Sequence, residues 1–215
     1  MHGFVLAGGK SSRMGSDKAL LEINKRPMIE IAVRKLRGFC AEVSIAGNRD
    51  DLAEFAPVVH ERRVDTGPAA GIEAGLAACG QPWAMFLPVD VPLVPPQLLR
   101  RWAEATVADV QEFERTAGSL LGCSLYTRSR AQPAFAMLRP EVVAVISEGL
   151  DQGERRIDVL LGNIRLLYGH ARYLRADAAW YVRSDQATEL GLWFTNVNTP
   201  EELAEAERHI DALDT

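Results

Sequence analysis

From Gly3 to Lys18 the chain carries the sequence GFVLAGGKSSRMGSDK, and this stretch decides the fold class. The apolar run from Gly3 to Leu6 ends directly in small residues, which is typical of a buried strand that enters a glycine loop. The loop then supplies three cations, Lys10, Arg13 and Lys18. Glycines let several backbone N–H groups point one way, and cations beside such donors favour phosphate. The stretch therefore predicts a polyphosphate-binding loop after a first strand, in preference to a glycine turn with solvated charges.

Two common phosphate-binding motifs do not fit this loop. A Walker A motif needs GxxxxGK[ST]; Gly9-Lys10-Ser11 supplies its ending, but Phe4 stands where the first glycine is required. A dinucleotide-binding GxGxxG is also absent, because no three glycines take that spacing. The loop is thus neither of these two motifs.

Strand and helix patterns alternate through the first half of the chain. Strand-like apolar runs follow the first at residues 43–46, 57–60 and 83–87. Helical patterns lie between and after them, opening at Pro27, Gly67 and Pro95-Pro96. This alternation predicts a parallel sheet with helices on both faces.

The second half is less regular. Strand-like pieces occur at residues 119–126, 134–137 and 192–197, with helical patterns at 141–148 and 157–161. A final helix is predicted from Thr199 as N-cap, Pro200 at the first helical position and Glu202 as the capping-box partner. Residues 1–215 are therefore expected to form a single Rossmann-like three-layer α/β domain with a mostly parallel, mixed central sheet and helices on both faces.

Composition excludes several classes of protein. Of the 215 residues, 47% are hydrophobic and 25% charged, which excludes a disordered chain, and the net charge of -5 excludes a globally basic nucleic-acid binder. We expect a cytoplasmic protein with neither nucleic-acid nor membrane partners, because a signal-peptide pattern and a long apolar run are both missing. All four lysines lie in the first 35 residues; Lys10 and Lys18 belong to the loop, whereas Lys25 and Lys35 are predicted to be solvated surface residues.

The opening loop closely resembles the signature loop of the molybdenum cofactor guanylyltransferases, the MobA family of nucleotidyltransferases with a nucleotide-diphospho-sugar transferase fold. The resemblance extends in order and rough spacing across nearly the whole chain. Its further blocks are Arg26-Pro27, Gly67-Pro-Ala-Ala-Gly-Ile72, Pro88-Val-Asp-Val-Pro92, Gln132-Pro133, Gly153-Glu-Arg-Arg156 and Asn196-Val-Asn-Thr-Pro-Glu-Glu-Leu203.

The resemblance implies transfer of GMP from GTP to the phosphate of molybdenum-bound molybdopterin, with release of pyrophosphate. It implies a nucleotide-binding half at 1–110, an acceptor-binding half at 111–215, and transient contact with cofactor-insertion proteins or molybdoenzymes. Three alternatives stay open: a cytidylyl enzyme for the same cofactor, a sugar-phosphate nucleotidyltransferase, and a non-catalytic GTP-binding accessory protein. The sequence LeuAlaGlyGly, in place of LeuAlaAlaGly, resembles the guanylyl class.

On this resemblance Arg13, Lys18 and Asp90 are the expected catalytic residues. Asp90 follows an apolar strand, so it should stand at the carboxyl edge of the sheet, where α/β proteins bind ligands. A lone carboxylate together with phosphate oxygens and waters suits Mg²⁺, the expected cofactor. Asp17 is expected to be a cap or a lysine partner. The expected GTP-binding residues are Leu6, Ala7, Gly8, Gly9, Lys18, Glu61, Asp65, Gly67 and Asp90.

Recognition of guanine has two candidate residues. An acidic residue before the Gly67 block normally binds the base in the family; an alignment without gaps gives Glu61, where aspartate is usual, and a shifted alignment gives Asp65. The family also often has asparagine at the end of the second strand, where Ala46 stands here, with Asn48 two residues on.

The acceptor side is carried by polar and basic residues of the second half. Asn196 and Asn198 alternate on a strand-like run, so they should face one side, towards the pterin or the turn into the last helix. At least one of the two adjacent arginines of the GlyGluArgArg block is expected to bind the molybdopterin phosphate, the alternative being that both are solvated helix charges. The full expected molybdopterin-binding set is Gln132, Arg155, Arg156, Asn196 and Asn198.

Overall fold

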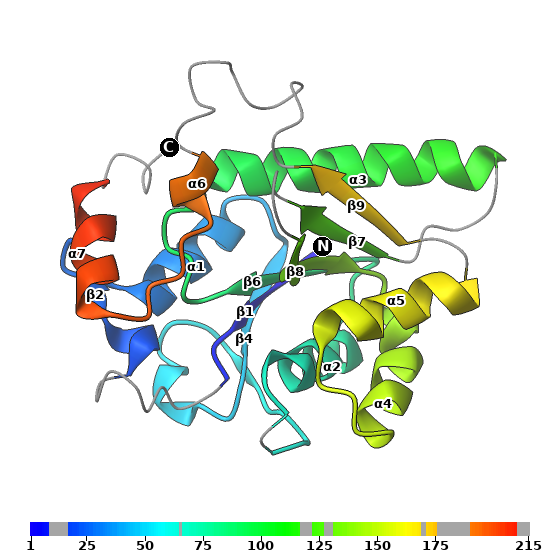
Figure 1. Ribbon diagram of the computed structural model, residues 1–215, viewed down its shortest axis with the longest axis horizontal. Coiled ribbons are helices and arrows are strands. Elements are labelled where there is room, and N and C mark those ends of the chain that lie inside the picture. The colour runs from blue at the N-terminus through cyan, green and yellow to red at the C-terminus, as the bar shows by residue number, and fades with distance from the viewer. Residues whose placement is uncertain are drawn as a thin grey trace.

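The computed structural model describes residues 1–8, 17–64, 66–116, 122–126, 131–168, 171–175 and 190–209. These residues form a layer of strands between two layers of helices (Figure 1). The strands of the main sheet are β1 (His2–Leu6), β4 (Glu42–Ala46), β5 (Val58–Val59), β6 (Ala84–Pro88), β7 (Gly122–Tyr126), β8 (Ala131–Leu138) and β9 (Ala171–Arg175). The α-helices are α1 (Met28–Arg37), α2 (Pro68–Ala78), α3 (Pro96–Thr116), α4 (Val143–Asp151), α5 (Ile157–Tyr168), α6 (Leu190–Trp193) and α7 (Pro200–Arg208).

The main sheet has the strand order β5-β4-β1-β6-β8-β7-β9. Strand β1 pairs in parallel with β4 and β6, β5 runs parallel to β4, and β9 runs parallel to β7. Strand β8 is antiparallel to both of its neighbours, β6 and β7. The predicted mostly parallel, mixed sheet is therefore confirmed, with β8 as the reversed strand.

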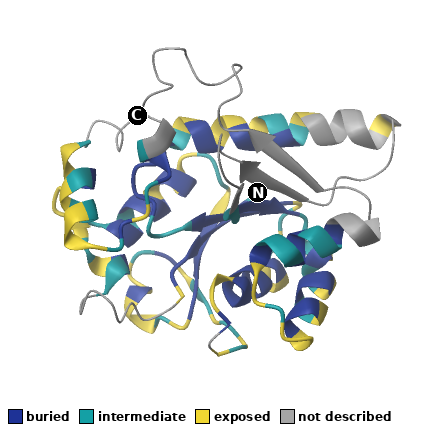
Figure 2. Ribbon diagram, viewed as in Figure 1, coloured by how far each residue is buried: buried dark blue, intermediate teal, exposed yellow. Residues whose placement is uncertain are grey.

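Alternation along β1 explains the two helical layers. Val5 points into a core with α1 and α3, whereas Phe4 and Leu6 point into a second core with α2, α4 and α5. Successive side chains of a strand leave on opposite faces, so a strand of apolar residues needs cover on both. Most residues of β1, β4 and β6 are accordingly buried at the centre of the molecule (Figure 2).

Most predicted elements of the first half are confirmed to within a few residues, and so is the last helix. The Thr199 hydroxyl accepts a hydrogen bond from the backbone N–H of Glu202, and the Glu202 carboxylate accepts one from the backbone N–H of Thr199. The structure adds three strands that sequence patterns did not predict, namely β9 and a small antiparallel ribbon of β2 (Glu22–Ile23) and β3 (Arg26–Pro27).

The predicted strand at residues 192–197 is wrong. Helix α6 ends at Trp193, and an extended segment follows that belongs to neither sheet. Its backbone is tied by a bond from Val197 N–H to the carbonyl of Asp90, at 2.8 Å, in place of a ladder. The apolar residues Trp193, Phe194 and Val197 are buried in the hydrophobic cores. Their apolar character therefore resembles that of a buried strand, although the segment pairs with no strand of the described structure.

Lys35 is also not the surface residue that was predicted. It lies in α1, is only 5% exposed, and its Nζ donates to the carbonyl oxygens of Pro92 and Val94, the latter at 2.7 Å. Lys25 is exposed as predicted, in the tight turn between β2 and β3. Lys35 thus fixes the loop that follows Asp90 onto α1.

In the part of the chain that the structure describes, no helix combines the length and apolar character that crossing a bilayer would require.

Candidate active site

A cavity of about 400 Å³ lies at the carboxyl ends of β1, β4 and β6. We call it the sheet-edge cavity. Six of its lining residues are ones that the sequence assigned to substrates, namely Leu6, Ala7, Gly8, Lys18, Asp90 and Asn196. The place is the one that parallel α/β sheets offer to ligands, because loops diverge from the strand ends there.

Lys18 is the centre of a polar cluster at one side of the cavity. Its Nζ donates to Oδ1 of Asn198 and lies 4.0 Å from Oδ2 of Asp90. Asn196 Nδ2 lies 3.5 Å from the same Asp90 oxygen. The two asparagines therefore face the same site, as their alternation predicted, although the segment that carries them is not a strand. The fold brings together groups from the start, middle and end of the chain.

The pKa of Asp90 is raised, because burial disfavours its charged form, although the nearby Lys18 ammonium works in the opposite direction. Its side chain is 23% exposed, on the loop directly after β6. The described residues contain no group of three or more histidine, cysteine or acidic side chains that could enclose a metal. Of the two carboxylates that line the cavity, Asp17 is engaged by Arg49. Asp90 is left as the candidate ligand for Mg²⁺, which binds through one or two carboxylates, substrate phosphates and several waters. A divalent cation beside Asp90 would also offset the cost of its burial.

Arg49 is a cavity-lining residue that the sequence interpretation missed. It follows β4 and donates from Nη1 to Asp17 Oδ1 at 3.0 Å and from Nε to Asp51 Oδ1 at 2.8 Å. Asp17 in turn caps the 3₁₀ turn at Lys18–Leu20, where it accepts from Ala19 N–H at 3.0 Å. Arg49 thus holds Asp17, the residue next to Lys18. Asp17 is a cap, as expected, but the cation that it pairs with is Arg49 and not a lysine. Its only sequence signal was a basic residue just after the second strand.

Glu61 is packed behind Gly8. A Cβ atom added at Gly8 would collide with Glu61 Oε1, and one added at Gly71 would lie 3.2 Å from it. The two glycines therefore leave the space that this carboxylate occupies. Oε1 is buried and has no hydrogen-bond partner among the described residues, and burial raises the pKa of Glu61. A buried acceptor without a donor is unusual. Glu61 does not itself line the sheet-edge cavity, but it packs against Gly8, which does.

Gly67 starts α2 in a conformation that requires glycine. Its φ of 64° and ψ of −160° lie in a region that residues with a side chain avoid. The turn directs Pro68 into the lining of the sheet-edge cavity. The alternative guanine residue, Asp65, lies outside the described residues, as do Gly9 and Arg13.

The acceptor residues are brought together only in part. Gln132 lies on β8 opposite Leu125, and its side chain is outside the described part. Arg155 and Arg156 precede α5 on an exposed loop and do not line the sheet-edge cavity. Arg156 pairs with Asp158 at 2.6 Å, whereas Arg155 donates to the carbonyl of Leu150 at 3.2 Å. The structure thus groups the two asparagines with Lys18 but leaves both arginines apart from them.

A mostly parallel sheet whose first strand ends at a cavity, with Lys18 and Asp90 at its edge, fits a nucleotidyltransferase of the α/β type. Comparison with known proteins identifies the family. Residues 3–164 match the model of the MobA-like NTP transferase domain, and the chain belongs to this family.

Relatives match along nearly the full chain. A molybdenum cofactor guanylyltransferase of Vibrio atlanticus is 32% identical over 205 residues, covering 94% of this chain and 92% of the relative. The one of Polynucleobacter asymbioticus is 32% identical over 209 residues, with the same coverage of both chains. Among solved structures, molybdopterin-guanine dinucleotide biosynthesis protein A of Archaeoglobus fulgidus superposes with a TM-score of 0.70 at 22% identity, covering 98% of this chain and 99% of its own, and this likeness supports the fold.

Proposed function

We propose that the chain transfers GMP from GTP to the terminal phosphate of molybdopterin, forming the guanine dinucleotide form of the cofactor and releasing pyrophosphate. Family membership and full-length relatives named for this activity support the reaction. The observation that carries the choice of guanine is the Glu61 carboxylate, buried against Gly8 with no donor among the described residues.

The proposed base site follows from donor and acceptor geometry. Guanine presents two adjacent donors, N1–H and the 2-amino group, and an ionised carboxylate can accept both. Adenine and cytosine have a ring-nitrogen acceptor beside their amino group, so either would turn a lone pair towards Glu61. The backbone of Leu6 to Gly9 and the turn at Gly67 would line the rest of the nucleotide. Asp65 remains the other candidate for the base.

In the proposed reaction an oxygen of the molybdopterin phosphate attacks the α-phosphorus of GTP. The bond from that phosphorus to the oxygen bridging to the β-phosphate breaks, and pyrophosphate leaves with the bonding electron pair. Lys18 and Arg13 are proposed to stabilise the charge that develops on the leaving group. The protein needs no nucleophile of its own, because the acceptor phosphate supplies it.

Asp90 is the proposed Mg²⁺ ligand, with phosphate oxygens and waters completing the coordination. When bound, Mg²⁺ would neutralise phosphate charge and hold the triphosphate in line for displacement. Asn196 and Asn198 are proposed to hold the pterin near Lys18, and Gln132 is proposed as a further contact of the pterin. At least one of Arg155 and Arg156 is proposed to bind the acceptor phosphate, which would require Arg155 to leave the carbonyl of Leu150 or Arg156 to leave Asp158.

A nucleotide panel tests the proposal. GTP, CTP, ATP and UTP are each supplied with Mg²⁺, and binding is measured by thermal shift and by pyrophosphate release in the presence of molybdopterin. We expect stabilisation and pyrophosphate release with GTP. A preference for CTP would favour the cytidylyl alternative, and GTP binding without pyrophosphate release would favour an accessory protein. Lys18→Ala serves as the low-activity reference.

A further inference from the structure

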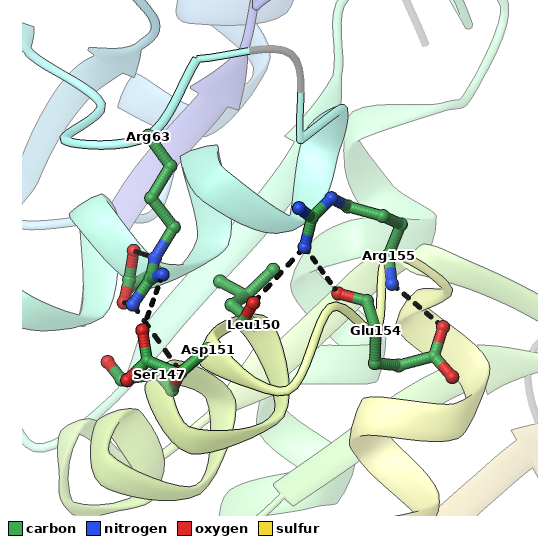
Figure 3. A network of polar contacts seen from close by, with 7 residues as sticks. Arg63, Ser147, Leu150, Asp151, Glu154 and Arg155 are labelled. Atoms are coloured by element: carbon green, nitrogen blue, oxygen red, sulfur yellow. Dashed lines mark hydrogen bonds and ion pairs between the residues drawn. The ribbon is translucent and has the colours of Figure 1, made fainter.

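Arg63 clamps the loop between β5 and α2 onto two helices (Figure 3). Its Nε and Nη2 donate to the two carboxylate oxygens of Glu73 on α2, at 2.9 and 3.1 Å. Its Nη1 donates to Asp151 Oδ1 at 2.7 Å, and Nη2 also lies 3.4 Å from the carbonyl of Ser147, both on α4. One guanidinium thereby joins the loop, α2 and α4. Its bidentate contact with Glu73 fixes its orientation.

The clamp is stronger than an ordinary surface ion pair. Glu73 is 7% exposed; burial alone would raise the pKa of its carboxyl, but hydrogen bonds from Arg63 and Ser147 outweigh burial and hold the pKa below its usual value. The Arg63 side chain is 26% exposed and its contacts are bidentate, so solvent screens them less than at an exposed pair. Removing the guanidinium would leave Glu73 as a buried and uncompensated charge.

The same loop carries Glu61 two residues earlier, and both residues contact α2. Glu61 packs against Gly71, and Arg63 binds Glu73. The neighbouring Val64 is 78% exposed, and Glu61 Oε1 has no bond to hold it among the described residues. Besides the exposed contact of His60 with Asp50, Arg63 provides the side-chain anchor of the described part of this loop.

We propose that Arg63 is a positioning residue that holds the Glu61 carboxylate in place between Gly8 and Gly71, and so sets the preference for a purine with a 2-amino group. The proposal rests on the proposed function, because it takes Glu61 as the group that meets the guanine edge. Arg63 itself would not touch the nucleotide. Its loss would let the loop relax and would misplace a carboxylate that must meet two donors at once.

The test compares GTP with inosine triphosphate, which lacks the 2-amino group, at saturating molybdopterin and Mg²⁺. A hydrogen bond from that group to a charged acceptor is worth on the order of 10- to 100-fold in kcat/KM, so the wild-type protein should prefer GTP by this factor. Arg63→Leu should raise KM for GTP and bring the ratio of the two kcat/KM values close to one, with kcat for GTP within about 2-fold. Arg63→Lys, which keeps the charge but loses the fork, should give an intermediate ratio.

Arg62→Leu is the matched control, since Arg62 is the exposed neighbour in the same loop and the change in charge is identical. It should keep the wild-type ratio. If Arg63→Leu does not fold, Arg63→Lys and Asp151→Ala, which removes the exposed partner in α4, provide the same comparison. Wild-type discrimination in all folded clamp variants would overturn the proposal.

A failure of the proposed function gives a different result. In that case the wild-type protein itself shows no preference for GTP, or Glu61→Gln leaves the preference intact, and the positioning role of Arg63 falls with it. Discrimination that is lost in Glu61→Gln but retained in the Arg63 variants overturns only the role of Arg63. Discrimination lost in both, with Arg62→Leu unaffected, supports both proposals.

Discussion

Replacement of Glu61 by glutamine should make the nucleotide-free protein more stable and at the same time a weaker binder of GTP. Glutamine has the same shape but carries no charge. The buried Oε1 of Glu61 lacks a donor among the described residues. Glutamine leaves a polar atom at the same place, so the variant relieves only the extra cost of burying an unpaired charge, which is on the order of 1–3 kcal/mol. Because the carboxylate is only half-buried, we take the lower end, about 1 kcal/mol, as the expected gain in the free energy of unfolding at pH 7.

The gain should depend on pH, and its sign follows from the raised pKa. Burial disfavours the ionised carboxylate in the folded protein, so the pKa of Glu61 lies above the ordinary value of 4.5. Below that ordinary value the group is protonated in both the folded and the unfolded chain, and the penalty vanishes. Above the folded-state pKa the penalty is complete. Glu61→Gln should therefore exceed the wild-type stability at pH 7 and match it near pH 4.

Urea unfolding without nucleotide at the two pH values measures this difference. Glu54→Gln, a change at an exposed glutamate, is the control and should not move the midpoint at either pH. Calorimetric titration should show GTP binding about 10- to 100-fold weaker for Glu61→Gln, since a charged hydrogen-bond acceptor is lost. A variant that is no more stable than wild type at pH 7, or whose gain is equally large at pH 4, would refute an unsatisfied carboxylate at this position.

Four further substitutions test other parts of the structure. Gly8→Ala should weaken GTP binding about 10-fold or more in a calorimetric titration, because the added methyl group displaces the carboxylate behind the glycine. Lys18→Ala should lower turnover, measured as pyrophosphate release, about 100-fold, which corresponds to about 3 kcal/mol of transition-state stabilisation. An unchanged rate would show that Lys18 has no part in the reaction. Asp90→Ala should fold, judged by circular dichroism, but stay nearly inactive at every Mg²⁺ concentration, and wild-type turnover at high Mg²⁺ would contradict the metal assignment. Lys35→Met should lower the free energy of unfolding by about 2 kcal/mol, because two backbone carbonyls lose their donor, whereas Lys25→Met should change it by less than about 0.5 kcal/mol.

Features set by neighbouring residues could be predicted from the sequence. The apolar run before Gly8 gave β1, and the capping box at Thr199 gave the start of α7. Asp90 was expected at the carboxyl edge of the sheet because it directly follows a strand, and it lies there beside Lys18. In each case, strand direction or a local hydrogen bond determines the outcome within a few residues.

Features set by contacts between distant residues could not be predicted. A lysine in a helix is normally solvated, and Lys35 is buried only because the loop after Asp90 offers it two carbonyl groups. Arg49 acquires a role only when the fold brings Asp17, 32 residues away in the sequence, within hydrogen-bond distance. The segment at 192–197 has the apolar content of a strand, but no strand edge in the described structure pairs with it.

The charges of the sheet-edge cavity explain why a metal belongs to the proposed reaction. Among its described lining residues, the charged ones are Asp17, Lys18, Arg49 and Asp90, so two cations meet two carboxylates. Arg49 is engaged with Asp17, and Lys18 lies beside Asp90, so the described lining residues offer little positive potential to a triphosphate; Lys10 and Arg13 of the glycine loop lie outside the described part. A bound Mg²⁺ would take over Asp90, and Lys18 would then be free to face phosphate. The raised pKa of Asp90 fits this argument, because one lysine does not offset the cost of its burial, whereas a divalent cation would.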